Sequence, residues 1–121
     1  DILGHIDLIR RYGCYDDRSL AYDEFIDTID EILKRLVQLG KGMEVNTRSY
    51  RDKEGIKTPV YDIKILKRYK ELGGEIITLG SDAHSIDSIG YKFDYFKEMI
   101  KNAGFKYTAY FTERKPNFIP L

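Results

Sequence analysis

The sequence predicts an α/β fold built on parallel strands. Short apolar segments of strand character alternate along the 121 residues with longer segments in which apolar residues recur every three or four positions, the spacing of an amphipathic helix. The connections between the apolar segments are too long for hairpins, which indicates parallel strands joined by right-handed crossovers. Polar residues gather directly after three of these segments, where parallel sheets and barrels place their functional sites.

Four strands are expected, each followed by a helix except the last. The first lies near residues 2–6, the second spans Met43–Asn46, the third Ile76–Leu79 and the fourth Tyr107–Phe111. Short apolar runs of this kind are typical of parallel strands that are buried on both faces. The tail 112–121 contains two prolines and no helical period, so no element is expected there. Four parallel strands with two open edges would make a poor isolated sheet but a good half of a barrel.

Three amphipathic helices are expected between these strands. The first begins near Asp23, which can act as its N-cap, and the second begins at Thr58-Pro59, a cap followed by proline in the first helical position. The third begins near Lys92. A glycine in the left-handed C′ position is expected to end each of them, and these glycines are Gly40, Gly73 and Gly104.

The composition gives no indication of a nucleic-acid or membrane partner. Hydrophobic residues make up 42% and charged residues 33% of the chain, as in an ordinary globular protein. The 20 Lys and Arg residues balance 20 Asp and Glu residues, so no bulk positive charge attracts nucleic acid. No apolar run approaches the length of a membrane span.

Cys14 is the single cysteine, which excludes an intramolecular disulfide and favours a reducing, cytoplasmic location. We expect it to be a small buried hydrophobe and not a nucleophile, because no third histidine is available to activate it. The chain opens with Asp1, directly before an apolar segment. We therefore expect it to begin inside a fold.

Side chains with metal-ligand character follow three successive strands. His5 comes after the first, Glu44 and Asn46 end the second, and Asp82 and His84 come after the third. The spacing of two places Glu44 and Asn46 on the same face of their strand. Because the carboxyl ends of parallel strands lie on one face, these side chains are expected to share one site.

Each of these residues also has a purely structural interpretation. Ser81 or Asp82 could cap the next helix beside an incidental His84. His5 could be a packed core histidine, and Glu44 and Asn46 could be solvated residues at a loop edge. The joint placement at three strand ends favours a shared polar site.

The residue types point to metal-dependent hydrolysis of a phosphate ester. Carboxylates and imidazoles without a thiolate suit Zn, Mn or Fe, which activate water for hydrolysis. The loop arginines Arg10, Arg11 and Arg48 add planar donors that match a phosphate group. For Arg51 we expect only surface solvation.

Three motifs, in this order, resemble those of the PHP (polymerase and histidinol phosphatase) superfamily, and most closely its histidinol-phosphatase branch. They are Gly4-His5-Ile6-Asp7, which opens a run ending in Arg10-Arg11-Tyr12, then Glu44-Val45-Asn46-Thr47, and then Gly80-Ser81-Asp82-Ala83-His84. Arg114-Lys115-Pro116 resembles the tail of that branch.

The resemblance implies a distorted seven-stranded β/α barrel with up to three divalent transition-metal ions. It makes His5, Asp82 and His84 metal ligands, with Glu44 a further candidate, and gives Asp82 and His84 the catalytic role. Substrate or phosphate contacts would come from Asn46 and Arg48, with Arg10 or Arg11.

The family's opening His-x-His motif is absent, so residues 1–121 are expected to be a partial domain, the C-terminal half of the barrel, inactive alone. The implied function is that of a cytoplasmic phosphatase that hydrolyses L-histidinol phosphate to L-histidinol and phosphate in histidine biosynthesis. The alternatives are another phosphoesterase of the superfamily, such as a polymerase-associated nuclease, or a half-barrel without catalysis. Apolar edges left open by a half-barrel predict oligomers or swapped assemblies.

Overall fold

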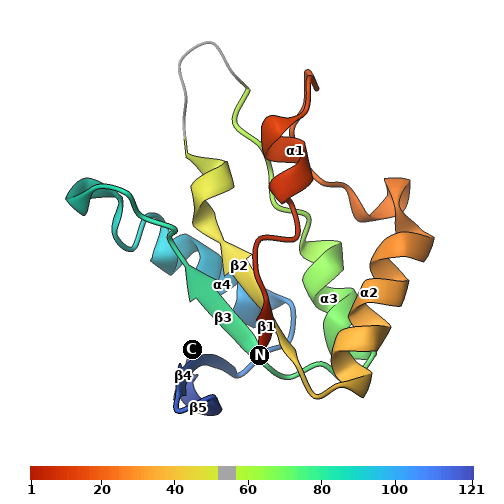
Figure 1. Cartoon of the computed structure of the whole chain (residues 1–121), viewed down its shortest axis with the longest axis vertical. Coiled ribbons are helices and arrows are strands. Elements are labelled where there is room, and N and C mark those ends of the chain that lie inside the picture. The colour runs from red at the N-terminus through yellow and green to blue at the C-terminus, as the bar shows by residue number, and fades with distance from the viewer. Residues whose placement is uncertain (52–56) are drawn as a thin grey trace.

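A computed structural model describes residues 1–51 and 57–121, and within these residues the chain forms a parallel sheet, flanking helices and a hairpin (Figure 1). The parallel sheet has the strand order β1-β2-β3, formed by Ile2–Leu3, Gly42–Asn46 and Ile77–Gly80. The α/β class and the parallel arrangement expected for these three strands are thus confirmed.

The α-helices and 3₁₀ helices alternate with the strands. The α-helices are α1 (Leu8–Tyr12), α2 (Ile26–Gln38), α3 (Ile63–Glu71) and α4 (Phe93–Asn102), and the 3₁₀ helices are η1 (Tyr22–Glu24), η2 (Thr47–Tyr50) and η3 (Ile86–Ser88). None of the described helices has the length and apolar character that a membrane span requires.

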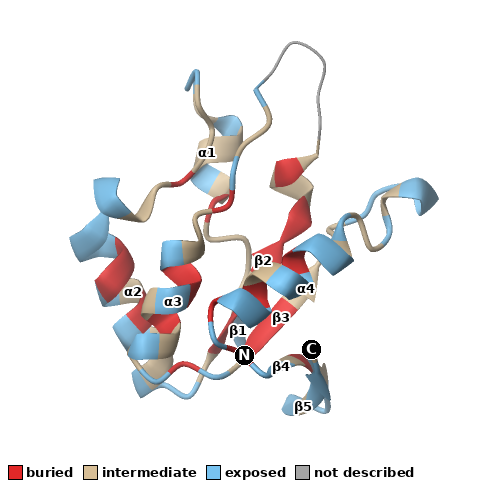
Figure 2. Ribbon diagram, turned by 180° about the vertical axis from the view of Figure 1, so that it is seen from behind, coloured by how far each residue is buried: buried red, intermediate tan, exposed pale blue. Residues whose placement is uncertain are grey.

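Helices α2, α3 and α4 pack on one face of the parallel sheet (Figure 2). Figure 2 shows α4 over β2 and β3, with α3 and α2 beside it, whereas Figure 1 shows the opposite face with no helix across it. Met43, Val45 and Ile77 are fully buried on the helix side, together with Leu33 and Ile100 of the helices. The alternation of side chains along a strand therefore directs Glu44 and Asn46 to the uncovered face.

The register of β2 against β3 brings small and polar residues together on that face. Glu44 lies opposite Thr78, and Asn46 lies opposite Gly80. A β-carbon at residue 80 would lie 2.0 Å from Oε1 of Glu44. Glycine at this position is therefore what allows the Glu44 carboxylate to lie across β3.

The prediction of a fourth parallel strand is wrong. β4 (Tyr107–Thr112) pairs antiparallel with β5 (Lys115–Pro120), in the tail where no element was expected. Both residues of the connecting turn, Glu113 and Arg114, have positive φ (49° and 64°), as a two-residue hairpin of type I′ requires. A hairpin of two edge strands tolerates the prolines of β5, whose nitrogens cannot donate.

The C-terminal ends of the helices were predicted more accurately than their N-terminal ends. Gly40, Gly73 and Gly104 have φ of 61°, 95° and 97° directly after their helices, as expected. The start near Asp23 is wrong, because that residue lies in η1 and α2 begins at Ile26.

Thr58-Pro59 does not begin α3 either. The side chain of Asp62 caps that helix instead, accepting from the Lys64 amide at 2.9 Å and from the Tyr22 amide at 2.8 Å. The expectation that Cys14 is buried is also wrong. It is exposed in the polar segment that follows α1.

Candidate functional site

The carboxyl ends of β1, β2 and β3 meet at one end of the parallel sheet, and the structure brings most of the predicted site residues together there. Glu44 Oε2 accepts hydrogen bonds from the His5 backbone amide at 3.0 Å and from Asn46 Nδ2 at 3.2 Å. The β1–α1 turn is thereby tied to the end of β2. His5 itself has a φ of 28°, in the left-handed region that few residues other than glycine adopt.

Arg11 is the centre of the cluster. Its side chain is only 8% exposed, and it contacts both the β2–η2 segment and the loop after β3. It donates to Ser49 Oγ from Nε at 3.1 Å and from Nη2 at 2.9 Å, to Asn46 Oδ1 at 3.4 Å and to Asp82 Oδ2 at 3.3 Å. A buried guanidinium with this many acceptors has one well-defined orientation.

Arg48 projects from η2 toward the segment that follows β3. Its backbone amide donates to Asn46 Oδ1 at 3.0 Å, which caps the 3₁₀ turn. Its Nη1 lies 3.4 Å from Asp82 Oδ1 and 2.7–2.8 Å from the two ring nitrogens of His84. His84 Nδ1 also lies 3.0 Å from the Asp82 carbonyl oxygen.

The electrostatics around Asp82 favour its ionised form. Burial acts to raise the pKa of Asp82, but the positive charge of Arg48 and the hydrogen bond and charge of Arg11 outweigh it, so the pKa lies below its ordinary value. The carboxylate is thus a stable negative charge between two guanidinium groups.

Two arginines differ in role from what the sequence indicated. Of the pair Arg10 and Arg11, only Arg11 enters the cluster, because Arg10 donates to the Asp17 carbonyl at 2.7 Å and lies over the Tyr15 ring at 4.0 Å. The expectation that Arg51 is merely solvated is wrong. Its Nη2 donates to the Ser81 carbonyl oxygen at 2.5 Å.

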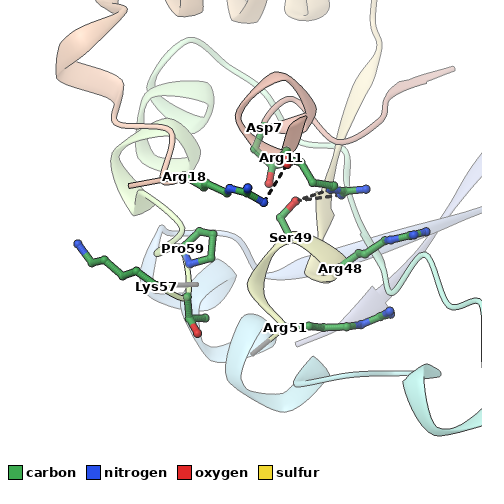
Figure 3. A pocket seen from close by; sticks show the side chains of 9 residues that line it. Asp7, Arg11, Arg18, Arg48, Ser49, Arg51, Lys57 and Pro59 are labelled. Atoms are coloured by element: carbon green, nitrogen blue, oxygen red, sulfur yellow. Dashed lines mark hydrogen bonds between the residues drawn. The ribbon is translucent and has the colours of Figure 1, made fainter. Parts of the chain in front are cut away.

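A small cationic pocket of about 30 Å³ adjoins the cluster (Figure 3). Five basic side chains and one carboxylate contribute to its wall, so its net charge favours an anion. Its lining residues are Asp7, Arg11, Arg18, Arg48, Ser49, Arg51, Lys57, Thr58 and Pro59. Arg18, Ser49 and Lys57 were not singled out from the sequence, because no motif spacing links them to the strand ends.

The predicted metal ligands have suitable donor atoms, but this chain does not gather them into a complete set. In the part of the chain that the structure describes, no group of three or more His, Cys, Asp or Glu side chains is close enough to hold a metal ion. The Asp82 carboxylate and the His84 ring face arginines instead. A transition ion needs four to six donors, so further ligands would have to come from outside these residues.

Comparisons with known proteins agree on one enzyme name. No family model matches the chain. Over 108 residues it is 44% identical to the "Probable histidinol-phosphatase" of Clostridium acetobutylicum, and over 112 residues 37% identical to the histidinol-phosphatase of Lactococcus lactis subsp. lactis. A "Probable histidinol-phosphatase" of Thermotoga maritima is 35% identical over 107 residues.

The chain is similar to histidinol-phosphatases. These alignments include 88%, 93% and 88% of this chain but only 40%, 40% and 42% of the relatives. The chain thus spans about two fifths of the length of the curated relatives that it matches.

A solved structure supports the same similarity at the level of the backbone. The crystal structure of histidinol phosphate phosphatase from Lactococcus lactis subsp. lactis, in complex with zinc, L-histidinol and phosphate, matches with a TM-score of 0.78 and 34% identity. The match covers 97% of this chain and 43% of that one. Nearly all of the fold described above is therefore similar to a part of that enzyme.

Proposed function

We propose that the protein to which this chain belongs is a metal-dependent phosphomonoesterase that hydrolyses L-histidinol phosphate to L-histidinol and phosphate. The observation that carries this proposal is the cluster of Arg11, Arg48 and Asp82 at the strand ends, in a chain whose backbone is similar to that of an enzyme solved with histidinol and phosphate. Guanidinium groups in fixed orientations are the donors expected for a phosphoryl group.

We propose further that residues 1–121 form the C-terminal β/α units of a distorted seven-stranded barrel of the PHP superfamily. The uncovered polar face of the parallel sheet supports this, since in a barrel that face would line the interior. The open edges at β1 and β3 would then pair with further strands.

In this proposal Arg11 and Arg48 bind the oxygens of the phosphoryl group and stabilise the charge that develops on them. Asn46 has a supporting role, because its Oδ1 accepts from both the Arg11 side chain and the Arg48 amide and so fixes their relative position. Arg10 is left out, since its side chain is engaged with the Asp17 carbonyl.

We propose that His5, Asp82 and His84, with Glu44, contribute ligands to a divalent metal site that the rest of the protein completes. Zinc is the first candidate, because the similar crystal structure contains it. Mn or Fe, and a cluster of up to three ions, also suit these donor types. Such ions supply polarisation of a phosphoryl oxygen and activation of a water molecule.

The test is phosphate release from L-histidinol phosphate by the full-length protein that carries this sequence. Arg48→Ala should lower kcat/KM by roughly 10-fold or more, because it removes a charge-assisted contact to the phosphoryl group. Arg35→Ala is the matched control, since Arg35 lies on α2 and contacts Gln38.

One result would contradict the role of Arg48, and another would contradict the proposed reaction. Unchanged kinetics in Arg48→Ala would remove Arg48 from the site. Cleavage of single-stranded DNA without release of phosphate from histidinol phosphate would instead favour the nuclease alternative.

A further inference from the structure

Arg51 spans the loop that carries Asp82 and His84. Its Nη2 donates to the Ser81 carbonyl oxygen at 2.5 Å and lies 3.4 Å from the Ser88 carbonyl oxygen. These two residues stand at opposite ends of the segment 81–88. One half-buried side chain therefore bridges the start and the end of this loop.

The loop has few apolar anchors of its own. Ile86 and Ile89 are 87% and 71% exposed, so their burial holds it only weakly. Asp82 has a φ of 46°, in the left-handed region, which aspartate adopts more readily than most residues other than glycine. Hydrogen bonds within the loop, such as that between Ser85 Oγ and Ser88 Oγ at 2.8 Å, act together with polar contacts from outside it.

Arg48 and Arg51 hold this loop in two different ways. Arg48 lies in η2 and Arg51 directly follows the last residue of that turn, and Figure 3 shows both side chains extending in the same direction. Arg48 contacts the side chains of Asp82 and His84. Arg51 contacts the backbone carbonyls that flank them.

We propose that Arg51 is a positioning residue that holds the 81–88 loop so that Asp82 and His84 face Arg11 and Arg48. It acts through the loop backbone and not on the phosphoryl group. Its effect on catalysis rests on the proposed function, whereas its effect on the loop does not.

Hydrogen–deuterium exchange of the full-length protein, without substrate or added metal, tests the effect on the loop. In Arg51→Met, amides of residues 81–91 should exchange roughly 10-fold faster, as expected when hydrogen bonds from a charged group are lost. Peptides from α2 and α3 should exchange as in the unsubstituted protein. Arg51→Lys keeps the charge but has no planar fork, so it should restore protection only in part. Arg35→Met is the control for loss of an arginine elsewhere.

Faster exchange throughout the chain would overturn the proposal, because Arg51 would then stabilise the fold as a whole. Unchanged exchange at residues 81–91 would overturn it as well.

Kinetics on histidinol phosphate provide the second measurement. Arg51→Met should lower kcat by roughly 10-fold while KM changes less than about 3-fold, because Arg11 and Arg48 remain to bind the phosphate group. A rise in KM with kcat unchanged would make Arg51 a direct phosphate ligand and overturn the positioning role. If the unsubstituted protein releases no phosphate but the loop still loosens in Arg51→Met, the proposed function fails and the assignment of Arg51 to the loop stands.

Discussion

Replacing Gly80 by alanine tests whether the sheet face holds the Glu44 carboxylate in place. The new β-carbon would lie 2.0 Å from Oε1 and 2.9 Å from Cδ of Glu44, so the carboxylate would have to move. Gly80 is not among the glycines with positive φ, so its backbone accepts alanine. The predicted damage is therefore local to the site.

The expected loss of stability follows from the hydrogen bonds that the carboxylate gives up. It accepts from the His5 amide at 3.0 Å and from Asn46 Nδ2 at 3.2 Å. Hydrogen bonds to a charged group contribute more to the free energy of unfolding when they are buried. Because Glu44 is partly exposed, we expect their loss to cost about 1.5–2 kcal/mol, near the lower end of the usual range. Alanine recovers about 0.4–1 kcal/mol by restricting the unfolded chain. The free energy of unfolding should thus fall by about 1 kcal/mol, and Tm by roughly 4 °C.

Thermal unfolding of four variants measures this. Gly13→Ala is the matched control, because its β-carbon would also meet a movable side chain, the Tyr15 ring at 1.9 Å, but away from the site. Its free energy of unfolding should change by less than about 0.5 kcal/mol. The double variant Gly80→Ala/Glu44→Ala should be no less stable than Glu44→Ala, since the displaced group is gone. Additive losses in the double variant would refute a conflict between residue 80 and the Glu44 carboxylate.

Asp30→Asn should lower Tm at neutral pH, because Arg68 donates to both carboxylate oxygens of Asp30 at 2.6 and 2.8 Å. The hydrogen bonds from Arg68 and Tyr22 hold the pKa of Asp30 well below its usual range. The stabilisation should therefore be complete above about pH 4 and decline as the pH falls further, which unfolding scans from neutral to acid pH would reveal. In the full-length protein, His84→Ala and Asp82→Ala should each lower the affinity for zinc, measured as the zinc retained after dialysis. The loss should exceed the ~10–100-fold that is typical when a ligand loses its hydrogen-bond partner. Full retention of zinc by both variants would exclude these two residues as ligands. The 121-residue chain should associate in sedimentation experiments, because its sheet edges are open and Phe118 is 49% exposed on the hairpin; a monomer at high concentration would argue against a half-barrel.

The convergence at the strand ends could be predicted because it depends on topology alone. Once strands 42–46 and 77–80 are parallel neighbours, Asn46 lies beside Gly80, and the residues that follow each strand come to the same edge. Helix ends could be predicted for a similarly local reason, since Gly73 and Gly104 supply the left-handed backbone that ends a helix. Whether the gathered residues bind metal and phosphate stays a prediction.

The parts that the sequence did not predict depend on turns and on tertiary hydrogen bonds. The β4–β5 hairpin was missed because Glu113 and Arg114 are not typical residues for a turn with two positive φ angles. The start of α3 was misplaced because Asp62 competes with Thr58 as a cap, and a contact with Tyr22 favours Asp62. Arg51 was assigned to solvent because no periodicity indicates that a side chain reaches a carbonyl 30 residues further along the chain.

The hydrogen bonds of Arg11 have a consequence for how this site can change during evolution. One guanidinium serves Ser49, Asn46 and Asp82 at once, so acceptors on the β2–η2 segment and on the loop after β3 share a single donor group. Lysine could satisfy these acceptors only in part, because its single ammonium lacks the planar fork. A substitution at Ser49 or Asn46 therefore changes what is tolerated at the other positions, and we expect these residues to be replaced together or not at all.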